Sequence, residues 1–478
     1  MRNKAWIIIS LMLGTFMASL DSSIVNVSLP IMQKQFKVAL DDIQWVITAY
    51  MLAFCVFMPL TNWLKSKIGL YKMYLISIVV FTVGSLLCGL SGGLTTLVPA
   101  RILQAMGGGA LTPVALSMLS LAFDEKERGT VMGWWGLGVV VGPALGPTLG
   151  GFLTQYFGWP YIFFVNLPFG VLAFLLAMKY LKKIGDTRDN APPFDLSGYL
   201  FFIVFIILFQ YSVARIEKAG FSSVMLYVTF AVSLLCLFGF IKTDIKKSNP
   251  VLDLSLFKSK AFVAGILVTV VRSVALFGGL FLLPFMLQGL MGYSELQTGL
   301  LLLPASAAVA ALMPVAGKWA DKHGARYISI AGLVLLIIST IQLAFLDKNS
   351  SVISIIIPMV LRGAGLGFLF SPVSSAVIGA VPKEHSATAS SYYSLFMQIG
   401  GSIGISVLAV FYQYLLHHYS RQGNSPEAVH LALKGGFLLS AAIIVIAIWP
   451  AFKIPTQALA GTQPEKAKNR QAFKDANV

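Results

Sequence analysis

The feature that most constrains this chain is a long series of apolar runs separated by short polar connections. A helix crosses the hydrocarbon core of a bilayer in about 20 apolar residues. Fourteen runs of roughly that length occur, at 5–30, 43–64, 71–92, 95–122, 130–154, 160–181, 196–214, 221–241, 260–287, 295–318, 327–346, 350–372, 388–415 and 433–453. The sequence therefore predicts an all-α polytopic membrane protein with 14 transmembrane helices.

Composition excludes the soluble classes that a net charge of +16 could suggest. Hydrophobic residues make up 57% of the 478 residues and charged residues only 11%, which leaves too few polar side chains for a water-facing surface. The basic residues form no single patch, so we expect no nucleic-acid partner. The chain has no metal-ligand cluster, nucleophile–base constellation or Walker-type phosphate loop, so we predict neither a metal site nor an enzyme. We interpret His417, His418 and His430 as part of a solvated outer connection.

The basic residues indicate the orientation of the chain. With the N-terminus in the cytoplasm, inner connections hold 25 of the 35 Lys and Arg residues and outer connections hold 7. The remaining three, Arg101, Arg272 and Arg362, lie within spans. This asymmetry predicts a multi-pass protein with both termini in the cytoplasm. Short connections and the absence of a disulfide pattern favour a bacterial inner membrane.

The two ends of the chain share an internal repeat. Gly69 and Gly324 end similar polar connections after the second and tenth spans, and Arg101 and Arg362 follow two spans later. We therefore expect two related six-helix bundles with two helices inserted between them, an arrangement that builds a cavity opening to alternate sides. The predicted units are a first bundle (1–182), the inserted helices with a linker (183–259), a second bundle (260–453) and a basic cytoplasmic tail (454–478).

Several motifs occur in order along nearly the whole chain. LDSSIVNVSLP in the first span resembles LDxTxVNVALP, RILQAMGGGA in the fourth resembles RxxQGxGxA, and GVVVGPALGPTLGG in the fifth resembles GxxxGPxxGG. Together they resemble the major facilitator superfamily, especially its fourteen-span drug:proton antiporter branch. The resemblance implies the major facilitator fold and multidrug efflux associated with antibiotic resistance. It also implies a secondary transporter driven by the proton gradient without a cofactor.

The resemblance also assigns two groups of residues. The antiporter motif of the fifth span consists of Gly138, Gly142, Pro143, Gly146 and Pro147. Glycines four residues apart form a flat helix face for close packing, and in the family this span favours exchange over symport. The cytoplasmic gating motif retains Gly69 in its first copy, and in its second copy Gly317, Asp321, Lys322, Gly324 and Arg326. The first copy departs from the family pattern at Asn62 and Ser66.

Asp21 is the only carboxylate at any depth within an expected span, because the other acids lie in connections, near interfaces or in the tail. A charged group in hydrocarbon is costly and usually functional, so we predict that Asp21 carries the coupled proton. At 1.5 Å per residue, Asp21 lies about 13 Å deep and Arg101 about 9 Å, within reach of a guanidinium. We therefore predict that Arg101 is its partner. The competing interpretations are a structural acid and an arginine that only positions a helix.

Other polar residues within the spans form the predicted substrate site. They are Asn26, Gln104, Arg272, Arg362, Tyr393 and Gln398. Three arginines against one acid make the interior positive when Asp21 is protonated. A positive interior favours a neutral, zwitterionic or anionic amphipathic substrate over a dication. Alternatively, Arg272 and Arg362 bind backbone carbonyls, and the aromatic residues only pack.

The leading hypothesis is a monomeric proton-coupled antiporter that exports amphipathic drugs or toxic compounds. The alternative within the same fold is an exporter or flippase of an endogenous lipid, fatty acid or metabolite, because the motifs describe the machinery and not the cargo. A uniporter, a symporter and a channel are rival hypotheses for a membrane protein of this composition.

Overall fold

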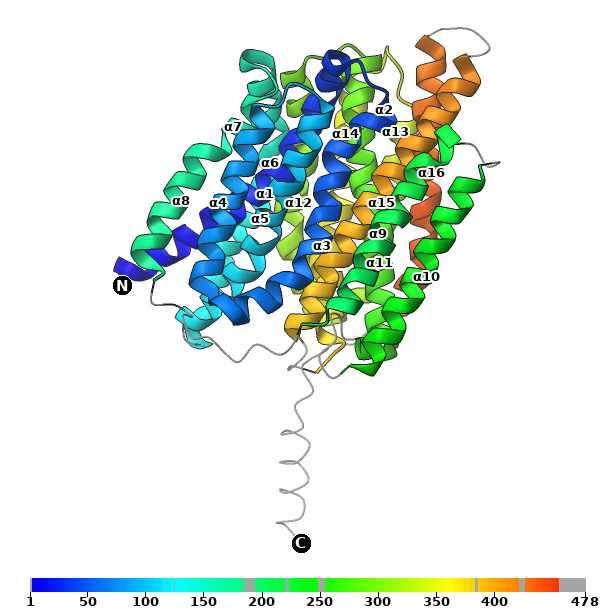
Figure 1. Ribbon diagram of the computed structural model, residues 1–478. Helices are drawn as coiled ribbons and strands as arrows, with labels where there is room; N and C mark the ends of the chain where they lie inside the picture. The colour runs from blue at the N-terminus through cyan, green and yellow to red at the C-terminus, as the bar shows by residue number, and fades with distance from the viewer. Residues whose placement is uncertain are drawn as a thin grey trace.

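The structure, a computed structural model, describes residues 2–123, 125–182, 184, 194–219, 223–247, 254–382, 386–420 and 426–454. Over these residues the chain is almost entirely helical and contains no strand (Figure 1). The helices are α1 (Arg2–Phe36), α2 (Leu40–Ile43), α3 (Trp45–Ile68), α4 (Leu70–Gly89), α5 (Leu94–Ala122), α6 (Glu125–Phe157), α7 (Tyr161–Phe164), α8 (Asn166–Tyr180), α9 (Leu196–Ala219), α10 (Val224–Lys246), η1 (Leu254–Lys258), α11 (Lys260–Pro284), η2 (Phe285–Leu290), α12 (Glu295–His323), α13 (Ala325–Ala344), α14 (Val352–Gly379), α15 (Ser386–Ser420) and α16 (Pro426–Ala451).

A long helix lies at each of the fourteen expected spans. Thirteen helices in the described residues are long and apolar enough to cross a membrane, and α6 occupies the remaining span. The predicted fold class is therefore confirmed, although several boundaries differ. Helices α15 and α16 extend beyond their spans, so His417, His418 and His430 lie in helices instead of a connection. The basic tail lies outside the described residues beyond Ile454.

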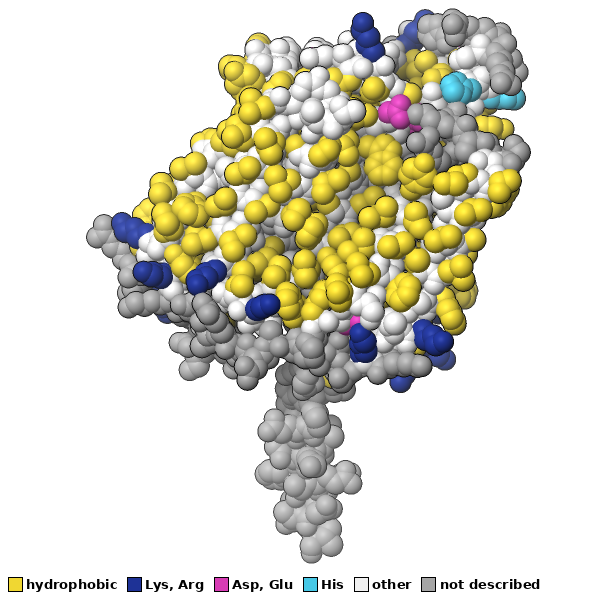
Figure 2. All heavy atoms as spheres, viewed as in Figure 1, with side chains coloured by type: hydrophobic (Ala, Val, Ile, Leu, Met, Phe, Trp, Pro, Cys, Tyr) yellow, Lys and Arg dark blue, Asp and Glu magenta, His cyan; other side chains and the backbone are white. Residues whose placement is uncertain are grey.

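The surface of the bundle is that of a multi-pass membrane protein. Apolar side chains cover the middle of the face in Figure 2, while Lys and Arg gather near the helix ends. On α10, Leu235 is 68% exposed and Phe238 is 65% exposed. Such a continuous apolar surface would be unstable in water, but it is compatible with the hydrocarbon core of a bilayer.

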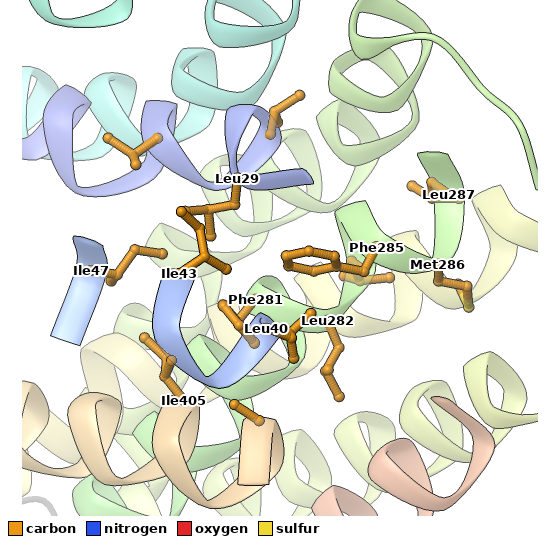
Figure 3. Packing of buried hydrophobic residues seen from close by; sticks show 14 of the residues in the cluster. Leu29, Leu40, Ile43, Ile47, Phe281, Leu282, Phe285, Met286, Leu287 and Ile405 are labelled. Carbon is orange, nitrogen blue, oxygen red and sulfur yellow. The ribbon is translucent and has the colours of Figure 1, made fainter. Parts of the chain in front are cut away.

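The two bundles share a large apolar core at one end, and a smaller one beside α9 that includes Cys55, Met58 and Leu395. Leu29, Leu40 and Ile43 of the first bundle belong to the same buried cluster as Phe281 and Phe285 of the second (Figure 3). Two other large clusters are each confined to one bundle. One includes Leu11, Phe81 and Leu111, and the other includes Phe262, Leu333 and Val373. The bundles are therefore joined by side chains where α1 ends and α2 lies, and we call this contact the α2-end seal.

Two lateral contacts also connect the bundles. Along α6 and α12 the backbones nearly touch, because a Cβ added at Gly299 would lie 2.4 Å from the Pro147 carbonyl oxygen. Along α3 and α15 the inserted helix α9 bonds to both neighbours. The Tyr199 hydroxyl donates to the Val56 carbonyl at 3.0 Å, and the Gln210 amide donates to the Ser402 carbonyl at 3.2 Å.

The repeat is visible in the backbone. Gly69 joins α3 to α4 with φ 86° and ψ 154°, and Gly324 joins α12 to α13 with φ 82° and ψ 162°. Positive φ strains any residue with a Cβ, so both turns need glycine. The same rare conformation at the two matched positions supports the pairing expected from the sequence.

Candidate functional site

Asp21 lies on α1 and is fully buried. The Arg101 guanidinium on α5 donates from Nη1 to Asp21 Oδ2 at 2.5 Å. The Gln104 amide, one turn further along α5, donates to Asp21 Oδ1 at 2.8 Å. The structure thus brings together the acid and the arginine that the sequence paired. Gln104, predicted as a substrate ligand, thus bonds to the same carboxylate as Arg101.

Arg101 is held on several sides besides the carboxylate. Its Nε donates to the Val46 carbonyl on α3 at 3.0 Å, and its Nη1 also lies 2.6 Å from Gln104 Oε1. The ring centroids of Tyr50 and Phe163 lie 4.2 and 5.5 Å from its guanidinium carbon. A buried ion pair is tolerated when further bonds and aromatic faces replace the lost water.

Two members of this network were not predicted from the sequence. Asn166, at the start of α8, donates from Nδ2 to Asp21 Oδ1 at 3.2 Å, and to the Ser85 hydroxyl at 3.3 Å. Ser85 on α4 also accepts from Gln104 at 2.7 Å. The only signal for Asn166 was an amide in an otherwise apolar span. We call Asp21, Ser85, Arg101, Gln104 and Asn166 the buried polar network.

The glycines of the antiporter motif form the surface on which α1 packs. A Cβ added at Gly138 would lie 2.6 Å from Met12 Cγ, and one at Gly142 would lie 2.8 Å from the Leu20 nitrogen. At Gly146 it would lie 1.9 Å from Ser23 Oγ. The flat face predicted for this span therefore exists, and it contacts Leu20 and Ser23 on either side of Asp21 in the sequence. Pro143 is exposed, whereas Pro147 is buried against α12.

The three other predicted substrate ligands with neutral side chains are not gathered at one point. Asn26 is buried and donates to the carbonyls of Ser22 and Ser23 on its own helix, at 3.4 and 3.1 Å. On α15, the Tyr393 hydroxyl lies 3.5 Å from the Phe370 carbonyl. Gln398 is 9% exposed, and its Oε1 accepts no hydrogen bond from the described residues.

The two arginines of the second bundle differ from each other. Arg362 on α14 donates from Nη2 to the carbonyls of Ala275 and Leu276, each at 2.9 Å, so the interpretation as a carbonyl-binding residue holds for it. Arg272 on α11 is fully buried and finds no hydrogen-bond acceptor among the described residues. Its guanidinium carbon lies 4.0 Å from the ring centroid of Phe370.

The gating residues lie near the start of α13. Arg326 donates from Nε to the Ile454 carbonyl at 2.7 Å, which joins the beginning of α13 to the end of α16. A Cβ at Gly317 would lie 2.7 Å from Ser371 Oγ, and Lys322 is exposed. The side chain of Asp321 lies outside the part of the chain that the structure describes.

Comparisons with known proteins agree with this architecture. The family model described as Major Facilitator Superfamily matches residues 11–405. Multidrug resistance protein Stp of Mycobacterium tuberculosis is 36% identical over 408 residues, which cover 85% of this chain and 75% of that protein. Riboflavin transporter RibZ of Clostridioides difficile is 30% identical over 449 residues, which cover 94% and 97%. The crystal structure of a bacterial homologue of the human lysosomal transporter Spinster, inward-facing and unoccupied, matches with a TM-score of 0.68 at 16% identity, covering 94% of this chain and 96% of that one.

Proposed function

Because this chain belongs to the Major Facilitator Superfamily, we propose that it is a proton-coupled antiporter that exports amphipathic drugs or toxic compounds by alternating access. The observation that carries the proposal is the buried pair of Asp21 and Arg101, 2.5 Å apart at the centre of the buried polar network. The 36% identity to multidrug resistance protein Stp supports drug export as the purpose.

The geometry supplies a way to couple the proton to the cargo. A proton and the Arg101 guanidinium compete for the same oxygen, Asp21 Oδ2. When the proton binds there, the carboxylate becomes neutral and the guanidinium keeps its charge with only the Val46 carbonyl, Gln104 and aromatic faces around it. Protonation therefore changes the interaction that holds α1 to α5.

The packing supports a cycle between two openings. In this structure the α2-end seal joins the bundles at one end and a smaller cluster joins them beside α9, while the two clusters towards the opposite end lie within single bundles. Rocking the bundles about the outer half would open one end as it closes the other. With the basic connections on the cytoplasmic side of a bacterial inner membrane, the end opposite the α2-end seal faces the cytoplasm, and cargo would enter there.

Energised inverted vesicles provide the test. Added substrate should collapse part of a preformed pH gradient with the wild type, because export returns protons through the carrier. Asp21→Asn should abolish this response, since an amide cannot exchange the proton. Asp347→Asn is the matched control, because it removes an exposed carboxylate that bonds only within its own loop. Undiminished proton dependence in Asp21→Asn would overturn the coupling proposal.

A second candidate is export of an endogenous metabolite, with lipids and fatty acids as further candidate cargo. The 30% identity to riboflavin transporter RibZ over 94% of this chain favours it. Riboflavin added to the same vesicles distinguishes the candidates. A pH response to riboflavin but not to a panel of toxic amphipathic compounds would support the metabolite.

A further inference from the structure

Arg272 is a buried charge without an oxygen acceptor in the part of the chain that the structure describes. Its side chain is fully buried, and Nε, Nη1 and Nη2 have no hydrogen-bond acceptor within the described residues. The rings of Phe370 on α14 and Tyr393 on α15 lie 4.0 and 5.7 Å from its guanidinium carbon. Aromatic faces attract the cation but offer no oxygen to its N–H groups.

The other two arginines within the spans have oxygen acceptors. Arg101 has the carboxylate of Asp21, and Arg362 has two carbonyl oxygens of α11. Leaving a charged group buried without such partners is strongly unfavourable. Of these three cations, Arg272 alone has no oxygen acceptor among the described residues, although Nη1 of Arg362 also lacks one. Arg272 therefore has the largest unused capacity to bind an anion.

The repeat places Arg272 where Asp21 lies in the first bundle. Gly142 and Gly146 of α6 pack on α1 around Asp21. In the second bundle, a Cβ at Gly400 of α15 would lie 2.6 Å from the Val270 carbonyl, and one at Gly404 would lie 2.5 Å from Val274 Cα. These glycines thus bracket Arg272 on α11 as the antiporter motif brackets Asp21 on α1. The glycine packing found around Asp21 in the first bundle is therefore repeated around a cation, Arg272, in the second.

We propose that Arg272 binds the anionic group of the cargo and that Phe370 and Tyr393 contact its apolar body. This inference rests on the proposed function and narrows its substrate class to amphipathic organic monoanions such as carboxylates. A guanidinium that stacks on a ring still directs its N–H groups outward in its own plane, where a carboxylate can accept two hydrogen bonds.

Two fluorescent probes that differ only in the charged group test the assignment. Pyrenebutyrate carries a carboxylate at pH 7.5, whereas pyrenebutanol has the same aromatic body and no charge. Binding to the purified full-length protein in zwitterionic nanodiscs should favour pyrenebutyrate. Arg272→Gln should weaken pyrenebutyrate binding about tenfold or more and change pyrenebutanol binding less than about twofold. Equal binding of both probes by the wild type, or unchanged preference in Arg272→Gln, would overturn the proposal.

Two further variants and a second lipid composition distinguish loss of the anion site from misfolding and from lipid binding. Arg272→Lys retains the cation and should retain the preference for pyrenebutyrate even if Arg272→Gln does not fold. Phe370→Leu should weaken both probes, because it removes an apolar contact as well as the aromatic face. Nanodiscs with phosphatidylglycerol separate cargo from lipid. Loss of pyrenebutyrate binding there would mean that a lipid headgroup occupies Arg272, against the assignment to cargo.

The outcome is separable from that of the proposed function. Probe binding in nanodiscs needs no proton gradient, so the anion preference is measured independently of proton coupling by the buried polar network. If pyrenebutyrate evokes no proton response in the wild type while the anion preference stands, the antiporter proposal fails and the anion site remains.

Discussion

Adding one methyl group at Gly142 tests whether the α6 glycine face holds Asp21 in place. The new Cβ would lie 2.8 Å from the Leu20 backbone nitrogen and 2.9 Å from Ser19 Cβ. Carbon and nitrogen atoms pack at about 3.5 Å, so α1 would have to move away by about 0.7 Å. Backbone cannot rotate aside as a side chain can. Asp21, the residue after Leu20, would then move away from Arg101 and Gln104.

Gly109→Ala is the matched control. Gly109 also lies within a helix, but its added Cβ would meet Phe54 at 3.5 Å or more, an ordinary contact. Both substitutions gain about 0.5–1 kcal/mol of helix stability. Overpacking costs about 1–3 kcal/mol, and only Gly142→Ala suffers it. We therefore expect Gly142→Ala to be about 1–3 kcal/mol less stable than Gly109→Ala.

Denaturant unfolding of the two variants in the same detergent, followed by tryptophan fluorescence, measures this difference. The vesicle assay supplies the functional half, in which Gly142→Ala should show a smaller substrate-induced proton response than Gly109→Ala. Equal stability within about 0.5 kcal/mol, together with equal proton responses, would refute the claim that this face positions Asp21.

Two further predictions concern the connections between helices. Burial raises the pKa of Asp195, but hydrogen bonds from Lys247 and from the start of α9 lower it by more, so its pKa lies below the usual value. The stability that the ionised Asp195 contributes is thus complete above about pH 4 and is lost as pH falls through its lower folded pKa. Thermal unfolding of Asp195→Asn should therefore vary less with acidification than that of the wild type, and parallel curves would contradict this. Gly324→Ala should lose about 1–2 kcal/mol because φ is 82°, whereas Gly92→Ala, in open space, should unfold near the wild-type temperature. Identical unfolding of these two alanine variants would show that the turn is not strained.

Much of the fold followed from the sequence because one physical constraint dominates it. A backbone in hydrocarbon must satisfy its own hydrogen bonds, so each apolar run of sufficient length becomes a helix. Asp21 and Arg101 could be paired from depth alone, since few oppositely charged groups are buried in the same bundle. The turn at Gly324 could be matched to Gly69 because the residues around them are similar.

The remaining features depend on which way helices face each other. Asn166 and Ser85 belong to the buried polar network only because α8 and α4 turn these residues toward α1. Arg362 and Arg272 look equivalent in sequence, yet one reaches carbonyl oxygens and the other meets aromatic rings. Helix rotation about its own axis decides such contacts, and an almost uniformly apolar helix carries little sequence pattern that specifies it.

The hydrogen bonds of α9 have a mechanical consequence for any cycle of opening and closing. This helix is hydrogen-bonded to α3 of the first bundle through Tyr199 and to α15 of the second bundle through Gln210. The opposite flank, at α6 and α12, has bare backbones in contact and no third element between them. The two flanks of the molecule therefore differ. The bundles are in direct backbone contact at α6 and α12, and they are hydrogen-bonded through α9 at α3 and α15. Each movement of one bundle relative to the other must therefore either break the hydrogen bond of Tyr199 or that of Gln210, or move α9 and α10 together with the bundle.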